Sequence, residues 1–88
     1  MTYKLTVQPH VDKTFKKIAK RDPPQHEAIE KKVDQILENP YRFKPLSGKM
    51  KNKRRAHIYS SFVLVYEIHE PEHEVELLDY DHHDNIYW

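Results

Sequence analysis

The feature that most constrains the fold is a nearly continuous apolar run at residues 62–68, FVLVYEI. A strand that covers a core with one face alternates apolar and polar residues, whereas a short continuous run is typical of a strand buried on both faces. A chain of 88 residues is long enough for one domain only. The run therefore predicts a central strand within a single domain that spans residues 1–88.

Two helices are predicted upstream of this strand. Asp22 is a candidate N-cap, and Pro23 suits the first helical position because its missing N–H costs little there. Asn39-Pro40 ends the second helix. The two apolar stripes with helical spacing are Val11, Phe15, Ile18 and Ala19, followed by Ile29, Val33, Ile36 and Leu37.

The other segments read as strands and turns. Alternation predicts strands at 3–7, 54–60 and 75–81, a loop at 41–53 with a turn at 46–48, and a turn at 70–72. The order is β-α-α-β-β-β. We expect an α+β fold in which the helix pair packs on one face of an antiparallel sheet.

Charge is segregated along the chain. Residues 39–66 hold seven Lys or Arg and no acid, whereas residues 67–88 hold eight acids and no Lys or Arg. A basic middle is typical of a polyanion-binding surface, although a solvated basic loop neutralised by an acidic strand explains it equally well. There is no cysteine, no apolar run long enough to span a membrane and no signal-peptide pattern, so we expect a soluble cytoplasmic protein.

Candidate chemistry gathers on the basic strand and at the C-terminus. Alternation places Arg55 and His57 on one face of the strand and Arg54 on the other. In a meander, the last strand brings His82-His83 and Tyr87 near that strand. Guanidinium, imidazole and phenol groups suit metal-free RNA cleavage by the neighbouring 2′-hydroxyl, which needs a base, an acid and cations around the phosphorane. The simpler interpretations are surface charges for the arginines and strand packing for His57, Tyr59 and Tyr66.

The segment 79–84, DYDHHD, also suggests a metal site. Adjacent strand residues point to opposite faces, however, so His82 and His83 would not easily bind one ion together if the strand continues through them. His69 and His73 flank a turn and are expected to be exposed. We therefore predict no metal and no other cofactor.

The order of several short motifs resembles the RelE/ParE superfamily of toxins from type II toxin–antitoxin modules. These motifs are ILENP at 36–40, Leu46-Ser47-Gly48, the strand at 64–68 and the close DHHDNIY at 81–87. The resemblance implies a RelE-like fold and a ribosome-dependent mRNA interferase that cuts the A-site codon without a metal. It also implies a cognate antitoxin as partner, with operator DNA in the complex and no membrane.

Carried over by position, the resemblance assigns a site. Tyr87 matches the catalytic tyrosine of the family, His83 an arginine near the scissile phosphate, and Arg54 and Arg55 the basic pair on the second strand. His57 and His83 are the candidate proton-transfer groups. The residues expected to contact RNA, ribosomal RNA included, are Lys49, Lys51, Lys53 and His82.

Three departures from the family pattern keep alternatives open. Val63 stands where the family carries an arginine, and Asp81 and Asp84 replace a glycine and an arginine of the closing motif. Arg55 or His57 compensates if the nuclease activity is kept. Otherwise the chain is a catalytically degenerate homologue, or a ParE-like toxin that inhibits DNA gyrase without chemistry of its own.

Overall fold

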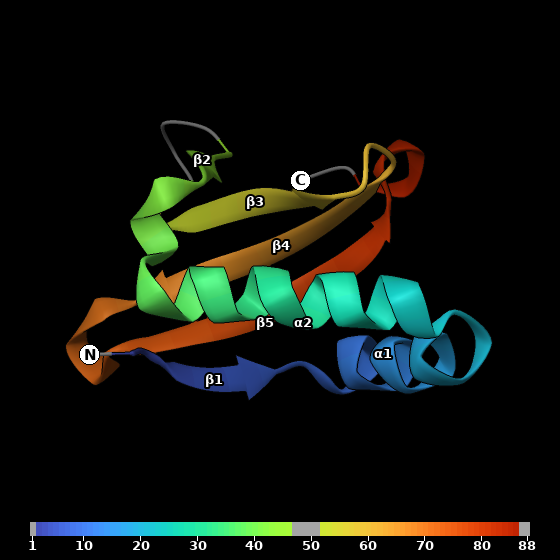
Figure 1. Cartoon of the computed structure of the whole chain (residues 1–88). Coiled ribbons are helices and arrows are strands. Elements are labelled where there is room, and N and C mark those ends of the chain that lie inside the picture. Colours follow the sequence, from blue (N-terminus) through green and yellow to red (C-terminus); the bar gives the residue numbers. More distant parts are fainter. Residues whose placement is uncertain (1, 47–51, 87–88) are drawn as a thin grey trace.

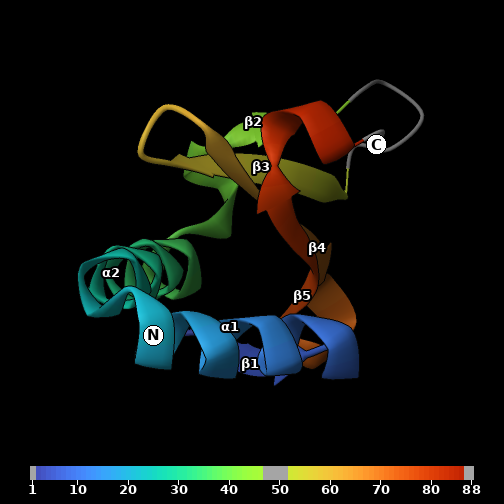
Figure 2. The same ribbon diagram turned by 90° about the vertical axis from the view of Figure 1, so that its right-hand side faces the viewer.

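The computed structural model describes residues 2–46 and 52–86 and has an α+β architecture (Figures 1 and 2). A five-stranded sheet has the order β1-β5-β4-β3-β2, with β4 in the middle. The two helices cover one side of it, and α2 lies in front of β5 in the view of Figure 1. The elements are β1 (Lys4–Val7), α1 (Pro9–Arg21), α2 (Pro23–Glu38), β2 (Lys44–Pro45), β3 (Lys53–Ile58), β4 (Phe62–His69) and β5 (Glu74–His82).

Both helix boundaries fall where the sequence predicts them. The Asp22 carboxylate accepts the N–H of Gln25 at 3.2 Å and so caps α2, while Pro23 occupies its first position. Asn39 ends α2, and Pro40 begins a short 3₁₀ turn that runs to Arg42. The hairpin of α1 and α2 is thus set by local chemistry.

The sheet is mixed, which corrects the expectation of a wholly antiparallel sheet. β1 pairs with β5 in parallel, from Lys4 opposite Glu74 to Val7 opposite Leu77. These two strands lie at opposite ends of the chain, so no turn between them sets their direction. The predicted loop at 41–53 also contains β2, where Pro45 sits on an edge strand that tolerates a missing N–H. Ser47 and Gly48 of the predicted turn lie outside the described residues.

Both faces of β4 are buried, as the apolar run predicts. Leu64 and Tyr66 face the helices and belong to the core with Ile29 and Ile36. The Tyr66 hydroxyl, which is also buried, donates to the carbonyl of Pro40 at 2.6 Å. Alternation turns Val63 and Val65 away from the helices, yet they are only 2% and 0% exposed. We call this second side of the sheet, opposite the helices, the outer face.

Candidate functional site

The outer face of β3 carries three polar side chains, Lys53, Arg55 and His57. The first pairs in register with Glu67, the second with Val65 and the third with Val63. Arg55 and His57 are exposed, whereas Ala56 and Ile58 between and beyond them are buried in the core. The predicted placement of Arg55 and His57 on one face is confirmed.

Arg54 lies on the opposite side of β3, and the structure does not bring it together with Arg55 and His57. Its Nη1 donates to the carbonyl of Phe43 at 2.7 Å and to that of Tyr41 at 3.3 Å. Its guanidinium also lies 5.1 Å from the centre of the Tyr41 ring. Arg54 therefore holds the segment that leads into β2.

A small pocket of about 250 Å³ opens between β2 and β3. It offers three cations and one imidazole, and none of the described residues that line it is acidic, so a phosphate group is the ligand it suits best. In the sequence, Arg42 and Lys44 lie in a basic segment that is predicted to be a loop, so nothing there assigns them to a site. The missing signal was the pairing of β2 with β3, which sets Lys44 opposite Arg55. The lining residues are Arg42, Phe43, Lys44, Arg55, Ala56 and His57.

The C-terminal histidines lie at the same end of the sheet as His57. In register, His57 is opposite Val63, which is opposite Asp81 on β5. The amide of His83 donates to the carbonyl of Ser61 at 2.8 Å, which fixes this segment beside the β3–β4 hairpin. Two strand spacings, about 10 Å, separate His57 from Asp81 across the sheet. His83 follows two residues after Asp81, and its ring stacks on that of His82. Tyr87, Lys49 and Lys51 lie outside the described residues.

Strand alternation was the wrong reason to reject a metal site in DYDHHD. The strand ends at His82, and a 3₁₀ turn begins at His83, so the two imidazoles stack with their centres 4.5 Å apart. Ligand atoms of His82, His83 and Asp84 lie within 4.8 Å of one another. His82 Nδ1 is already occupied, because it accepts the Asp84 amide at 3.2 Å.

His69 and His73 are both half-buried, contrary to the expectation that they are exposed. His73 stacks on Tyr3, with ring centres 3.8 Å apart. His69 lies beside Glu67 and Glu76, and the hydrogen bond that its imidazole donates to Glu76 raises the pKa of His69. Sequence spacing missed this cluster because Glu76 comes from the neighbouring strand.

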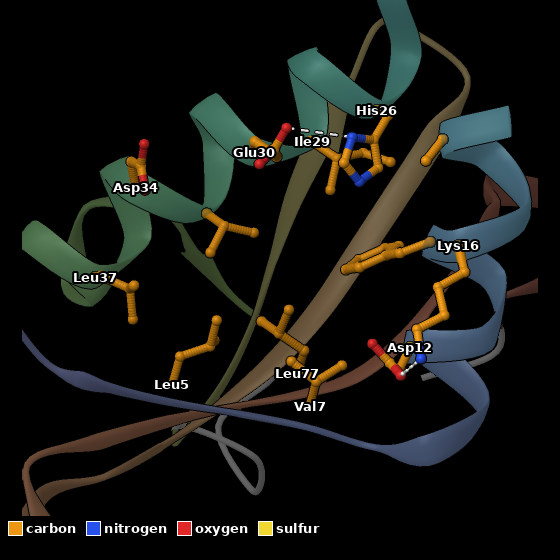
Figure 3. A pocket seen from close by; sticks show the side chains of 13 residues that line it. Leu5, Val7, Asp12, Lys16, His26, Ile29, Glu30, Asp34, Leu37 and Leu77 are labelled. Carbon is orange, nitrogen blue, oxygen red and sulfur yellow. Dashed lines mark ion pairs between the residues drawn. The ribbon is translucent and has the colours of Figure 1, made fainter. Parts of the chain in front are cut away.

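A second pocket, of about 370 Å³, lies on the helix side of the sheet between α1, α2 and β1 (Figure 3). Its floor is apolar and includes Leu5, Val7 and Leu77. Ion pairs within each helix line its rim, such as His26 with Glu30 at 3.2 Å. Its apolar floor suits apolar side chains.

Comparison with known proteins identifies the family of this fold and site. The family model described as the ParE toxin of the type II toxin–antitoxin system parDE matches residues 2–87. The chain belongs to this toxin family. The RelE/ParE resemblance drawn from its motifs is thereby confirmed.

Two archaeal relatives match the toxin over nearly its whole length. An uncharacterized protein of Methanosarcina mazei is 47% identical over 85 residues, which cover 97% of this chain and 99% of the relative. A protein of Methanocaldococcus jannaschii named "Putative toxin RelE4" is 41% identical over 85 residues, which cover 97% of this chain and 90% of the relative.

Solved structures share the fold of the toxin. The YoeB/ParE toxin from Agrobacterium tumefaciens superimposes with a TM-score of 0.80 at 18% identity, over 91% of this chain and 98% of that one. The toxin–antitoxin complex RelBE2 from Mycobacterium tuberculosis gives a TM-score of 0.75 at 20% identity, over 93% and 99%. The predicted RelE-like fold is confirmed. Neither described helix of the toxin is long and apolar enough to cross a membrane.

The position of Val63 explains how this toxin departs from the motif pattern. Val63 is buried between His57 on β3 and Asp81 on β5. An arginine side chain there would reach the outer face, where β3 instead offers His57 and, two residues away, Arg55.

Proposed function

We propose that this toxin is a ribosome-dependent mRNA endoribonuclease that cleaves by metal-free attack of the 2′-hydroxyl. The observation that carries the proposal is the pocket between β2 and β3, whose described lining contains Arg42, Lys44, Arg55 and His57 and no acidic residue. A cluster of cations with no acid to neutralise it is stabilised by binding an anion. A backbone phosphate of RNA matches its size and charge.

The chemistry divides between a proton acceptor and a proton donor. One group removes the proton of the 2′-hydroxyl, whose oxygen attacks phosphorus, and another gives a proton to the departing 5′-oxygen. The products are a 2′,3′-cyclic phosphate and a 5′-hydroxyl. His57 and His83 take these two roles, since imidazole exchanges protons near neutral pH. Arg55, with Arg42 and Lys44, neutralises the phosphorane, and Tyr87 orients the 2′-hydroxyl.

Cleavage of an mRNA on purified ribosomes, mapped by primer extension in the presence of a chelator, tests the proposal. We expect cuts confined to the A-site codon. His57→Gln and His83→Gln should each slow the cleavage rate about 100-fold or more, as loss of a general acid or base does. Lys17→Gln is the matched control, because Lys17 is exposed on α1 away from the outer face.

The mechanism would be overturned if cleavage disappeared in the presence of chelator. It would also be overturned if the histidine variants cleaved mRNA as fast as the Lys17 control. If the toxin leaves ribosome-bound mRNA uncut while an active control toxin cuts it, the proposed activity itself is wrong.

Val63 favours one alternative, a toxin that binds DNA gyrase without cutting RNA. Its buried apolar side chain stands at the β4 position where the motif pattern of the family has an arginine. In that case micromolar toxin stops DNA supercoiling by gyrase, while the mRNA bound on ribosomes remains uncut. Unchanged supercoiling would exclude the alternative.

An antitoxin is the proposed partner in either case, with operator DNA bound through that complex in the cytoplasm. The superposition on a toxin–antitoxin complex supports this partner. Co-expression with the small protein encoded next to the toxin should give a stable complex that no longer cuts RNA. Failure of that protein to bind would remove the support.

A further inference from the structure

The outer face carries a second polar cluster at the end remote from the basic pocket. Glu67 and His69 project from β4, and Glu76 projects from β5 in register with Glu67. Along β4, Glu67 lies two residues, or about 7 Å, from Val65, which pairs with Arg55, and four residues, or about 13 Å, from Val63, which pairs with His57. The three side chains are 24%, 31% and 21% exposed, so the cluster is partly shielded from water.

The three ligand atoms converge on one point. His69 Nε2 lies 2.9 Å from Oε1 of Glu76 and 3.8 Å from Oε1 of Glu67. A tetrahedral zinc ion with bonds of about 2.0–2.2 Å separates its ligand atoms by about 3.3–3.6 Å. The two distances from His69 bracket that range, and the ligand oxygens of Glu67 and Glu76 lie within 4.8 Å of each other, so small side-chain movements would bring all three atoms to zinc-binding distances.

The other oxygen of each carboxylate has a partner from outside the cluster, a hydrogen-bond donor for Glu76 and a more distant cation for Glu67. Gln8 Nε2 donates to Oε2 of Glu76, and Lys53 Nζ lies 3.8 Å from Oε2 of Glu67. Such outer contacts orient metal ligands and leave the inner oxygens free to bind. They come from the segment before α1 and from β3, so the cluster joins parts of the chain that are distant in sequence.

A proton alone satisfies this arrangement less fully than a metal ion. Protonated His69 can donate through Nε2 to Glu76, but 3.8 Å to Glu67 exceeds hydrogen-bonding distance. A divalent ion would contact all three groups at once. Imidazole and carboxylate ligands without thiolate suit zinc and cobalt, with water at the remaining open position.

We propose that Glu67, His69 and Glu76 form a binding site for a divalent transition-metal ion of the zinc class. The ion ties β4 and β5 to the segment entering α1 and takes no part in RNA cleavage. The proposal is independent of the nuclease activity, since it concerns the opposite end of the sheet and is tested without RNA.

Titration of the untagged toxin with Co²⁺ and Zn²⁺ at pH 8 tests the site, because protons compete less for imidazole there. We expect one equivalent of Co²⁺ with visible absorption, displaced by Zn²⁺. His69→Gln and Glu67→Gln should each weaken binding at least 20-fold, and Gln8→Ala about 10-fold, as removal of an outer hydrogen-bond donor does. Far-UV circular dichroism shows whether each variant is folded.

The matched control is the double variant His82→Gln, His83→Gln, which removes the other histidine cluster. It should bind Co²⁺ as the wild type does, and Zn²⁺ should raise the Tm of both but not of folded His69→Gln. Binding that survives in His69→Gln and Glu67→Gln, binding that disappears in the control, or no binding at 1 mM ion (about the weakest affinity expected of a specific site) would each overturn the proposal.

Discussion

The two ends of the outer face use similar residues in opposite ways. At one end, Lys53, Glu67, His69 and Glu76 form a chain of contacts in which every charge has an opposite partner. At the other end, Arg42, Lys44 and Arg55 gather around His57, and none of the described acids lies within ion-pairing distance of these three cations. Paired charges hold strands together, whereas clustered unpaired cations are available to an anionic ligand. Substitutions at the two ends should therefore have different effects.

The largest effect should separate two cations on the same face of β3. Arg55→Gln should lower the rate of mRNA cleavage about 100-fold, because it removes a donor to the phosphorane. Lys53→Gln, two residues away, should change the rate less than about 3-fold, because Lys53 is paired with Glu67. Single-turnover cleavage on ribosomes measures both. Equal losses in the two variants would mean that overall charge, not the pocket, governs the activity.

Substitution of the adjacent residues Arg54 and Arg55 should affect the stability of the protein differently, with the larger loss at Arg54. Arg54→Ala should lower the free energy of unfolding by about 1.5–3 kcal/mol, since it removes charged hydrogen bonds to the carbonyls of Tyr41 and Phe43. Arg55→Ala should change it by less than about 0.5 kcal/mol, because an exposed cation among cations contributes little. Urea unfolding measures both. A larger loss for Arg55 would show that the outer face is held together by that side chain.

The salt dependence of RNA binding should also distinguish the basic pocket from the paired charges at the other end of the outer face. Each phosphate contact to single-stranded RNA contributes about −0.7 to the slope of log K against log salt concentration. The double variant Arg42→Gln, Lys44→Gln should therefore make the slope shallower by about 1.4. Lys53→Gln should leave it nearly unchanged. Filter binding of a short RNA over a range of salt provides the slopes, and identical slopes for all three proteins would place the RNA elsewhere.

Local chemistry made much of this fold predictable, and strand pairing accounts for what was not. Pro23 and Asp22 indicate the start of α2, and the apolar run indicates β4, because each signal acts within a few residues. The parallel partner of β1 and the short strand β2 carry no such signal. The site is also predictable only where its residues are close in sequence. Arg55 and His57 follow from alternation, whereas Lys44 joins the pocket only through its pairing with Arg55.

The same limit explains the metal cluster. His69 and Glu67 are neighbours by alternation on β4, but Glu76 reaches them through the register of β5, which shifts between Val65 and Tyr66. That irregularity cannot be read from the sequence. The interpretation of His82-His83 failed for a related reason, because the end of a strand is decided by its partner.

The smallest effect should come from Glu70, a carboxylate held mainly by hydroxyl groups. Tyr41 and Tyr3 both donate to it, and His73 lies 3.7 Å away. The hydrogen bond from Tyr41, and then that from Tyr3, lower the pKa of Glu70 below its ordinary value of 4.5. The folded protein thus binds fewer protons here than the unfolded chain does. The contribution to stability is complete above pH 4.5 and is lost as the pH falls through the lowered pKa.

Because Glu70 is exposed, we expect only a slight difference in Tm between the wild type and Glu70→Gln near neutral pH, and a difference that shrinks further below pH 4.5. Thermal unfolding followed by circular dichroism across that range measures it. A Tm gap that widened on acidification would reverse the sign of the linkage. It would also show that the hydroxyl groups around Glu70 do not favour its charged form, unlike the cations that pair with the carboxylates of the outer face.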